Sequence, residues 1–475
     1  MKAEVLSPDQ IKRIHAASLA ILERVGVEVP HDEILGRFAD AGAKVDRAAK
    51  RVRIPPALVE KLVGGAGKQF TLKGRDESKT APFGQGHRNY NANAGEAYWT
   101  DAPGTPRRWC SLADVATAAR FSDALPCINI PGAMSDPHEL PVAWRCVEVA
   151  ATMLRNTTKP LYFWFHDRAS ARFLVEIAVA VRGTAERAAE APPFMPFFEP
   201  ISPLRFPFNG IDLLFETSRI GMPVPVGPMA QMGLSAPATR AGTMAQENAE
   251  VLAGICITQL VEPGLPVCHS GICHAFDMAT TQMIFSGPEQ AVFGVAMTQM
   301  GKSYGLPVYI NVGLTDSKRP DAQAGLEAGV TLALGAAAGA DIFGHFGISG
   351  VDQASSLDLL TFQNEVISYV EGTLRDLDVS DDALGLDALT EAGPGGSFID
   401  TDHTAEHFRK ETWFPGLLDR RFYEAWQESG ASSTEERCRA RTREILDQHV
   451  PKPVPADLDR ELTRIVAAAK KELGG

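Results

Sequence analysis

The chain has 475 residues, of which 45% are hydrophobic, and it carries a formal net charge of −13 at pH 7. This length and apolar content allow one large domain, or two to three ordinary ones, with a substantial core. The negative charge gives no general attraction to nucleic acid or to anionic lipid, so we expect neither nucleic acid nor a membrane as a partner.

The N-terminal sequence and the cysteines indicate a soluble, cytoplasmic chain. "MKAEVLSPDQ" lacks the apolar core of a signal peptide, and no run in the chain approaches the roughly 20 uncharged apolar residues of a membrane span. The seven cysteines are scattered without a CxxC pair, and most fall in apolar surroundings. We therefore expect reduced, buried thiols.

The first part of the chain is predicted to be helical. Residues 7–10, "SPDQ", match a capping box with proline at the first helical position, and an apolar stripe follows until Gly26. Two further helices are expected before residues 75–110, which are rich in glycine, asparagine and aromatic residues. We expect hairpins or ordered loops there, and an N-terminal helical lobe with a loop-rich segment over residues 1–110.

From residue 111 onward, short apolar runs alternate with longer helical stretches, which is typical of a parallel sheet covered on both faces. The runs are residues 127–132, 160–165, 194–200, 223–228, 266–271, 307–313 and 341–347. With an eighth strand near residues 395–401, this predicts an α/β fold, a (β/α)8 TIM barrel over residues 111–400. An open doubly wound sheet is the alternative, although no GxGxxG joins a strand to a helix. Residues 401–475 are expected to form a C-terminal helical extension.

Polar side chains follow several of these strands, at the barrel end where catalytic groups gather. They are Glu199, His269, Asp316, Lys318 and His345. Each residue alone is compatible with a structural role. Several such ends meeting at one rim would form an active site.

Two other chemistries stay open at this point. The histidines His269, His274 and His345, with Glu199 or Asp316, supply the ligand types of a zinc site, but no HxH or HExxH spacing is present, which disfavours a metal. A lysine at a strand end near carboxylates permits Schiff-base chemistry. However, a Schiff-base lysine needs a desolvated pocket, and Lys318 is followed by an arginine in a polar loop. A lysine in a salt bridge is the favoured interpretation.

Aromatic residues concentrate near the predicted strand ends, among them Phe163, Trp164 and Phe346. Aromatic faces attract organic cations, and quaternary ammonium groups in particular. An aromatic cage beside carboxylates would suit a methylated amine, and ordinary core packing is the alternative for any one of these rings.

Three long segments resemble a known family. They are "LSPDQIKRIHAASLAILERVGVEV", "YGLPVYINVGLTDSKRPDAQAG" and "GPGGSFIDTDHTAEHFRKETWFPGLLDRR". They are similar to the trimethylamine methyltransferase family, specifically to its members without pyrrolysine. The resemblance implies a TIM barrel that moves a methyl group from a methylated amine to the Co(I) of a separate corrinoid protein. Because all 475 residues are standard, it favours a quaternary amine such as glycine betaine over trimethylamine.

The site expected from these observations has two groups of residues. The candidate catalytic residues are Asp316 and Glu199, as electrostatic partners of the cation, and His345, which when protonated would hold a substrate carboxylate. The candidate substrate-binding residues are Phe163, Trp164, Phe346, His269 and Lys318. We expect no metal and no tightly bound cofactor, since the corrinoid (cobalamin) belongs to the partner protein.

Two functions compete with this one: a Schiff-base lyase that uses Lys318, and a protein that binds betaine without turnover. The expected partners are the corrinoid protein, the methylated amine and further copies of this chain in a homo-oligomer.

Overall fold

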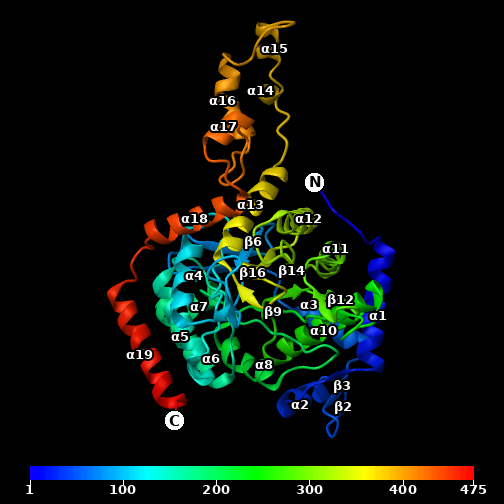
Figure 1. Cartoon of the computed structure of the whole chain (residues 1–475). Coiled ribbons are helices and arrows are strands. Elements are labelled where there is room, and N and C mark those ends of the chain that lie inside the picture. Colours follow the sequence, from blue (N-terminus) through cyan, green and yellow to red (C-terminus); the bar gives the residue numbers. More distant parts are fainter. Residues whose placement is uncertain (475) are drawn as a thin grey trace.

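Parallel strands close into a barrel at the centre of the computed structural model, which describes residues 1–474 (Figure 1). Five of the strands form one sheet in the order β6 (Asn89–Ala92), β15 (Ile342–Phe346), β14 (Val308–Asn311), β11 (Val267–Ser270) and β9 (Val224–Val226). Single parallel bridges continue the ring, and they pair Phe198 with Val226, Leu161 with Phe194, Gly132 with Tyr162, and Asn91 with Ile130. The last bridge returns to β6, so eight strand positions close into the predicted (β/α)8 barrel.

One strand prediction was wrong. The seven apolar runs occupy barrel positions, but residues 395–401 contain no strand, and β6 takes the eighth place. β6 reads "NYNA", and the Asn89 side chain donates to the carbonyls of Pro82 (2.7 Å) and Asp341 (2.9 Å). Buried amides that bond neighbouring backbone replace the apolar residues that mark the other strands. The division of the chain at residues 110 and 400 stays a prediction, with barrel strand β6 lying before the first boundary.

Helices cover the outside of the barrel between successive strands (Figure 1). They are α4 (Leu112–Ala124), α5 (Val142–Asn156), α6 (Arg168–Arg182), α7 (Ala185–Glu190), α8 (Phe208–Asp212), α9 (Leu214–Thr217), α10 (Arg240–Val261), α11 (Pro288–Ser303), α12 (Ala322–Ala338) and α13 (Leu357–Thr373). α10 is buried along most of its length, because the N-terminal helix α1 (Pro8–Arg24) packs over it. The predicted capping box of α1 is present, with Ser7 N–H donating to Gln10 Oε1 at 2.8 Å.

The N-terminal lobe carries the remaining helices and small antiparallel sheets of the first 83 residues. These elements are α2 (Asp32–Asp40), α3 (Pro56–Gly65), β1 (Val27–Glu28), β2 (Lys44–Asp46), β3 (Arg51–Arg53), β4 (Phe70–Lys73) and β5 (Thr80–Phe83).

Two small sheets follow the carboxyl ends of the barrel strands. One joins β10 (Gln231–Met232), β12 (His274–Asp277) and β13 (Gln282–Ile284). The other joins β16 (Ile348–Ser349), β17 (Ala354–Ser355), β7 (Tyr98–Trp99) and β8 (Arg108–Trp109). They build up the end of the barrel at which a TIM barrel carries its active site.

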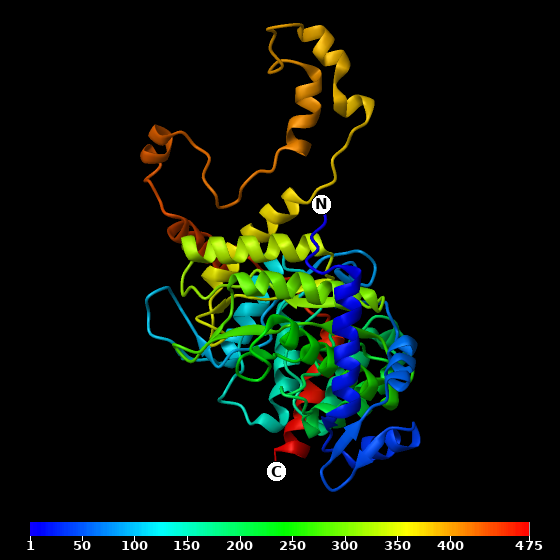
Figure 2. The same cartoon turned by 90° about the vertical axis from the view of Figure 1, so that its right-hand side faces the viewer.

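Beyond α13 the chain leaves the barrel as a long arm, which we define as residues 375–433 (Figures 1 and 2). It holds α14 (Asp381–Leu384), α15 (Leu386–Ala392), α16 (Asp402–Glu411) and α17 (Tyr423–Glu428), none of which has a buried residue. The chain then returns through α18 (Thr434–Gln448), and α19 (Ala456–Leu473) packs against α5 and α6. No helix of residues 1–474 combines the length and apolar character needed to cross a membrane.

Candidate functional site

A pocket of about 600 Å³ opens where three neighbouring barrel strands end. We call it the rim pocket. Its walls come from the segments after Tyr162, Phe198 and β9, and they include Trp164, Phe165, His166, Phe197, Glu199, Ser202, Asn209, Met229, Gln231 and Ser235. Two of the predicted site residues, Trp164 and Glu199, therefore lie in one pocket at the expected end of the barrel.

Aromatic rings form one side of the rim pocket. The Trp164 ring lies 6.4 Å from the Phe197 ring in an edge-on arrangement, and its Nε1–H donates to the Gly95 carbonyl at 3.0 Å. The ring of Tyr309 lies 5.7 Å from that of Phe197. The hydrogen bond fixes the indole, so that a ring face is available to a cation.

The carboxyl group of Glu199 is solvent-accessible within the pocket, yet protein surrounds it on most sides. Desolvation and, to a smaller extent, the negative charge of Asp352 together raise the pKa of Glu199 to about 7. Across residues 1–474 no hydrogen bond and no basic group lowers this pKa. Glu199 is thus an acid without a protein counterion.

Two further carboxyl groups outside the pocket lining are linked to Glu199, because the charge of Asp352 acts on both Glu199 and Glu96. Desolvation raises the pKa of Asp352 to about 6, and desolvation and the charge of Asp352 raise that of Glu96 to about 8. In the part of the chain that the structure describes, neither group has a basic neighbour that stabilises its charge. We call Glu96, Glu199 and Asp352 the rim carboxylates.

The loop that carries Asp352 is strained. It joins β16 to β17, and Val351 and Asp352 adopt φ values of 60° and 57°. A left-handed conformation is unfavourable for a β-branched residue such as valine, and such strain concentrates at functional sites. The strain is consistent with a loop that is held so as to place Asp352 near the other two carboxylates.

Two buried acids of α10 hold the loops around the pocket. Glu250 accepts hydrogen bonds from Ser202 Oγ (2.6 Å) and Leu204 N–H (2.8 Å), which fixes the loop after Glu199. Glu247 accepts from the N–H groups of Ala230 and Ile272, at 3.0 and 2.8 Å, and so ties together the segments after β9 and β11. These acids position backbone, in contrast to the rim carboxylates.

His345 lies at the inner end of this region. Its Nε2 lies 3.3 Å from the hydroxyl of Tyr162, and its ring is 6.2 Å from that of Trp164. Burial lowers the pKa of His345 to about 3, which favours the uncharged imidazole at neutral pH. Its predicted role, to bind a substrate carboxylate when protonated, stays a prediction.

Asp316 and Lys318 lie outside the rim pocket. The Asp316 carboxylate accepts from Phe285 N–H (2.9 Å) and Ser286 N–H (3.4 Å), so both its oxygens hold the loop before α11. Lys318 is exposed, and its Nζ donates to the Asp316 carbonyl at 2.7 Å. An exposed, hydrogen-bonded ammonium lacks the desolvation that activates a Schiff-base lysine.

Three other predicted binding residues are packed away from the pocket. Phe163 is 1% exposed and stacks on Phe165, and Phe346 is fully buried in the cluster that packs against α12 and α13. His269 is also fully buried, with Nε2 3.0 Å from Asn248 Oδ1 on α10. Burial lowers its pKa to about 4. The structure thus corrects these residues from cage or ligand positions to the layer between barrel and helices.

Comparison with known proteins decides the family. The family model described as "Trimethylamine methyltransferase (MTTB)" matches residues 1–474. The chain belongs to the trimethylamine methyltransferase (MTTB) family. It is therefore a methyltransferase, as the resemblance implied.

Individual members of this family match over nearly their whole lengths. The glycine betaine methyltransferase of Desulfitobacterium hafniense strain Y51 is 28% identical over 475 residues, covering 100% of this chain and 98% of that protein. The trimethylamine methyltransferase MttB of Desulfitobacterium hafniense strain DSM 10664 / DCB-2 is 29% identical over 469 residues, covering 98% and 94%. Among solved structures, the Methanosarcina barkeri monomethylamine methyltransferase MtmB matches at 9% identity with a TM-score of 0.47, covering 99% of this chain and 95% of that one.

Sequence reasoning missed several residues of this candidate site. Glu96 lies in a loop-rich stretch and Asp352 in a short hairpin, and neither directly follows an apolar run. Phe197 and Tyr162 lie inside aromatic runs in which nothing marks the inward-facing residue. The signal that was available is the alternation of side chains along a strand, which assigns Tyr162 and Phe163 to opposite faces.

A metal site is not supported. No group of three or more His, Cys, Asp or Glu side chains within residues 1–474 could hold a metal ion. His274, the third histidine considered as a ligand, is fully buried and stacks on Phe285 with both ring nitrogens unpartnered. All seven cysteines are free thiols, and six of them are buried.

Proposed function

We propose that this methyltransferase moves a methyl group from a quaternary amine to the Co(I) of a separate corrinoid protein. The observation that carries the proposal is Glu199, which lines the same pocket as the ring of Trp164 and whose raised pKa, like those of Glu96 and Asp352, no basic side chain within residues 1–474 opposes. Unneutralised carboxylates beside an aromatic wall form a site for an organic cation.

A quaternary amine suits such a site better than a tertiary one. Its nitrogen is permanently positive, so it attracts the carboxylates at any pH at which they are ionised. When the methyl carbon is attacked, a neutral tertiary amine leaves and no proton has to be supplied.

The residues of this chain bind and orient the substrate. The Co(I) of the corrinoid supplies the nucleophile that accepts the methyl group. Trp164 and Phe197 exclude water on one side of the ammonium group, and Glu199 holds its charge. Such positioning lowers the barrier because the methyl group is already desolvated and aligned.

The corrinoid partner is supported by the family and by the position of the pocket. The rim pocket lies where barrel strands end, at the carboxyl end of the barrel, and no arm residue is among those that line it. The arm itself continues from the end of α13 (Figure 1).

We further propose a homo-oligomer, in which the arm contacts another copy of the chain. Large apolar side chains of the arm are exposed without a core of their own, among them Leu377 (83%), Ile399 (86%) and Phe422 (87%). Apolar patches of this kind mark interaction sites.

The test supplies Co(I) cobalamin, in place of the corrinoid protein, together with a panel of methylated amines, and follows methylcobalamin formation by absorbance. We expect methyl transfer from at least one quaternary amine, little from tertiary amines, and a lower rate for Glu199→Gln. If no amine in the panel methylates Co(I), the proposal is wrong.

The same assay separates the two competing functions. A betaine-binding protein would bind quaternary amines without forming methylcobalamin. A Schiff-base lyase would be trapped by borohydride with a carbonyl substrate and would lose activity in Lys318→Ala, a change that we expect to leave methyl transfer intact because Lys318 is exposed outside the pocket.

A further inference from the structure

We infer that the preferred substrate is a quaternary ammonium ion that carries no carboxylate. This inference rests on the proposed function and narrows its substrate class. A betaine has a cationic and an anionic end, so its binding site needs partners for both. The rim pocket has charged partners for the cationic end alone.

One carboxyl group, that of Glu199, lines the pocket, and the charge of Asp352 acts on both Glu199 and Glu96, whereas no lining side chain is permanently positive. No lysine or arginine is among the residues that line it. The pKa values of Glu96, Glu199 and Asp352 are all raised, and within residues 1–474 no basic side chain opposes the shift of any of them. A guanidinium or ammonium group close enough to bind a substrate carboxylate would lower these pKa values, since it would stabilise each carboxylate.

Two imidazoles lie at or near the pocket, and an imidazole lacks the permanent charge of a lysine or arginine. Burial holds the pKa of His345 at about 3, so its ring is uncharged at neutral pH. His166 lines the outer part of the pocket, and its Nδ1 lies 3.1 Å from the Val142 carbonyl. That contact orients the ring toward backbone of the neighbouring α5 segment.

The polar groups that remain suit a neutral end of a ligand. Tyr309, outside the pocket lining, is 1% exposed, and its hydroxyl lies close to the side chains of Tyr162 and Asn91. Gln231 and Ser235 offer an amide and a hydroxyl at the outer wall. A hydroxyl or ether can exchange hydrogen bonds with such groups, whereas a carboxylate among the rim carboxylates meets like charges.

The closing experiment compares two ligands with the same trimethylammonium head by calorimetry at pH 8. Choline ends in a hydroxyl, and glycine betaine ends in a carboxylate. We expect choline to bind at least about tenfold more tightly, because repulsion between like charges removes much of the attraction of the betaine head. The neutral choline isostere 3,3-dimethylbutan-1-ol should bind more weakly than choline, which confirms that charge is recognised.

Variants show which residues discriminate between choline and glycine betaine. The double variant Glu199→Gln with Asp352→Asn should bring the ratio of choline affinity to glycine betaine affinity close to one, mainly by weakening the binding of choline. Asp387→Asn in the arm should leave this ratio unchanged. Circular dichroism checks that each variant is folded, and the comparison of ligands on the unaltered protein needs no variant.

The two proposals fail in different ways. If glycine betaine binds as tightly as choline or more tightly, this inference is wrong and a quaternary-amine methyltransferase remains. If neither ligand binds and no amine yields methylcobalamin, the proposed function fails as well.

Discussion

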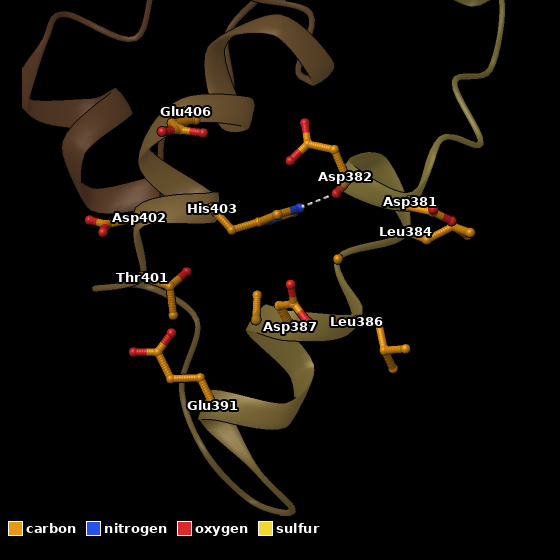
Figure 3. A pocket seen from close by; sticks show the side chains of 12 residues that line it. Asp381, Asp382, Leu384, Leu386, Asp387, Glu391, Thr401, Asp402, His403 and Glu406 are labelled. Carbon is orange, nitrogen blue, oxygen red and sulfur yellow. Dashed lines mark hydrogen bonds between the residues drawn. The ribbon is translucent and has the colours of Figure 1, made fainter.

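The rim carboxylates and the acidic residues of the arm are two groups of acids that differ in what surrounds them. In the arm, Asp381, Asp382, Asp387, Glu391, Asp402, Glu406 and His403 line a hollow of about 640 Å³ between α14, α15 and α16 (Figure 3). All six acids are exposed, and His403 Nε2 lies 3.0 Å from the Asp382 carbonyl. Water solvates these charges from the open side.

In the rim pocket the acids are fewer and their environment is different. Protein raises the pKa of each rim carboxylate, and the Trp164 ring lies beside Glu199 in the pocket wall. The electric field of a charge is stronger where water is excluded. The comparison shows that desolvation and a missing counterion indicate a cation site, and that the number of acidic residues or the size of a hollow does not.

Of the expected effects on cation binding at the rim pocket, the effect of pH is the largest. Protonation removes the charge of each rim carboxylate, and the pKa values of about 6, 7 and 8 place this loss between pH 8 and pH 5. Affinity for tetramethylammonium should therefore fall as pH falls, by roughly a hundredfold over this range if each lost charge costs about 1 kcal/mol. Calorimetry across pH measures it, and an unchanged affinity would contradict a carboxylate site.

Stability should respond to pH in the opposite sense. The folded-state pKa of Glu199, about 7, is raised above its ordinary value, so the folded protein binds an extra proton below pH 7. The stability gained from that proton is present at low pH and is lost as pH rises through about 7. The melting temperature of Glu199→Gln, relative to wild type, should accordingly increase from pH 5 to pH 8. A constant difference would show that the pKa of Glu199 is not raised.

Removing a single rim charge should have the next largest effect. Glu199→Gln should weaken binding of tetramethylammonium by about tenfold at pH 8, because solvent in the pocket reduces the attraction of one charge to about 1–2 kcal/mol. The matched control is Asp387→Asn in the arm, where we expect no change. Equal effects at the two positions would show that the two acidic regions do not differ in cation binding.

Removing the aromatic wall should cost less. Trp164→Leu keeps an apolar side chain but removes the ring face, which contributes about 0.5–1 kcal/mol to binding of a partly solvated cation, or roughly threefold to fivefold in affinity. The control Trp426→Leu changes a tryptophan of the arm and should leave affinity unchanged. If Trp164→Leu binds as tightly as wild type, the ring is not part of the site.

The smallest expected effect on ligand binding comes from the arm itself. The two sides of the arm approach each other where Arg375 Nη1 donates to the Lys410 carbonyl at 2.6 Å, so residues 378–408 can be replaced by a short Gly-Ser linker. Affinity for tetramethylammonium should not change. The mass measured by light scattering should fall from that of an oligomer toward that of one chain, and an unchanged mass would argue against the arm as the contact.

Much of the barrel could be read from the sequence, because a strand buried on both faces is an apolar run. The seven runs from 127–132 to 341–347 are recognisable for this reason. β6 was missed because it is rich in asparagine, which is typical of loops. The buried side chain of Asn89 is accommodated by its hydrogen bonds to backbone carbonyls. Residues 395–401 lie in the arm and contain apolar residues that are exposed. Their sequence resembles that of a buried strand, and this is why a strand was predicted there.

The candidate site was predictable only in part, and the reason is geometric. "YFWF" is aromatic at every position, so its letters do not reveal that Tyr162 contacts His345 while Phe163 packs on Phe165. Asp316 and Glu199 both follow strands, yet only the contacts show that backbone amides occupy both oxygens of Asp316.

By itself the sequence determined the family, the barrel and the end of the barrel at which to look, because these depend on residue types and on their order along the chain. The tertiary structure alone decided which acids act together. Glu96, Glu199 and Asp352 are separated by 103 and 153 positions, and they become one site only because the barrel closes through β6 and the loop after β15 returns toward the mouth. Their raised pKa values are a property of that enclosure, which no single segment contains.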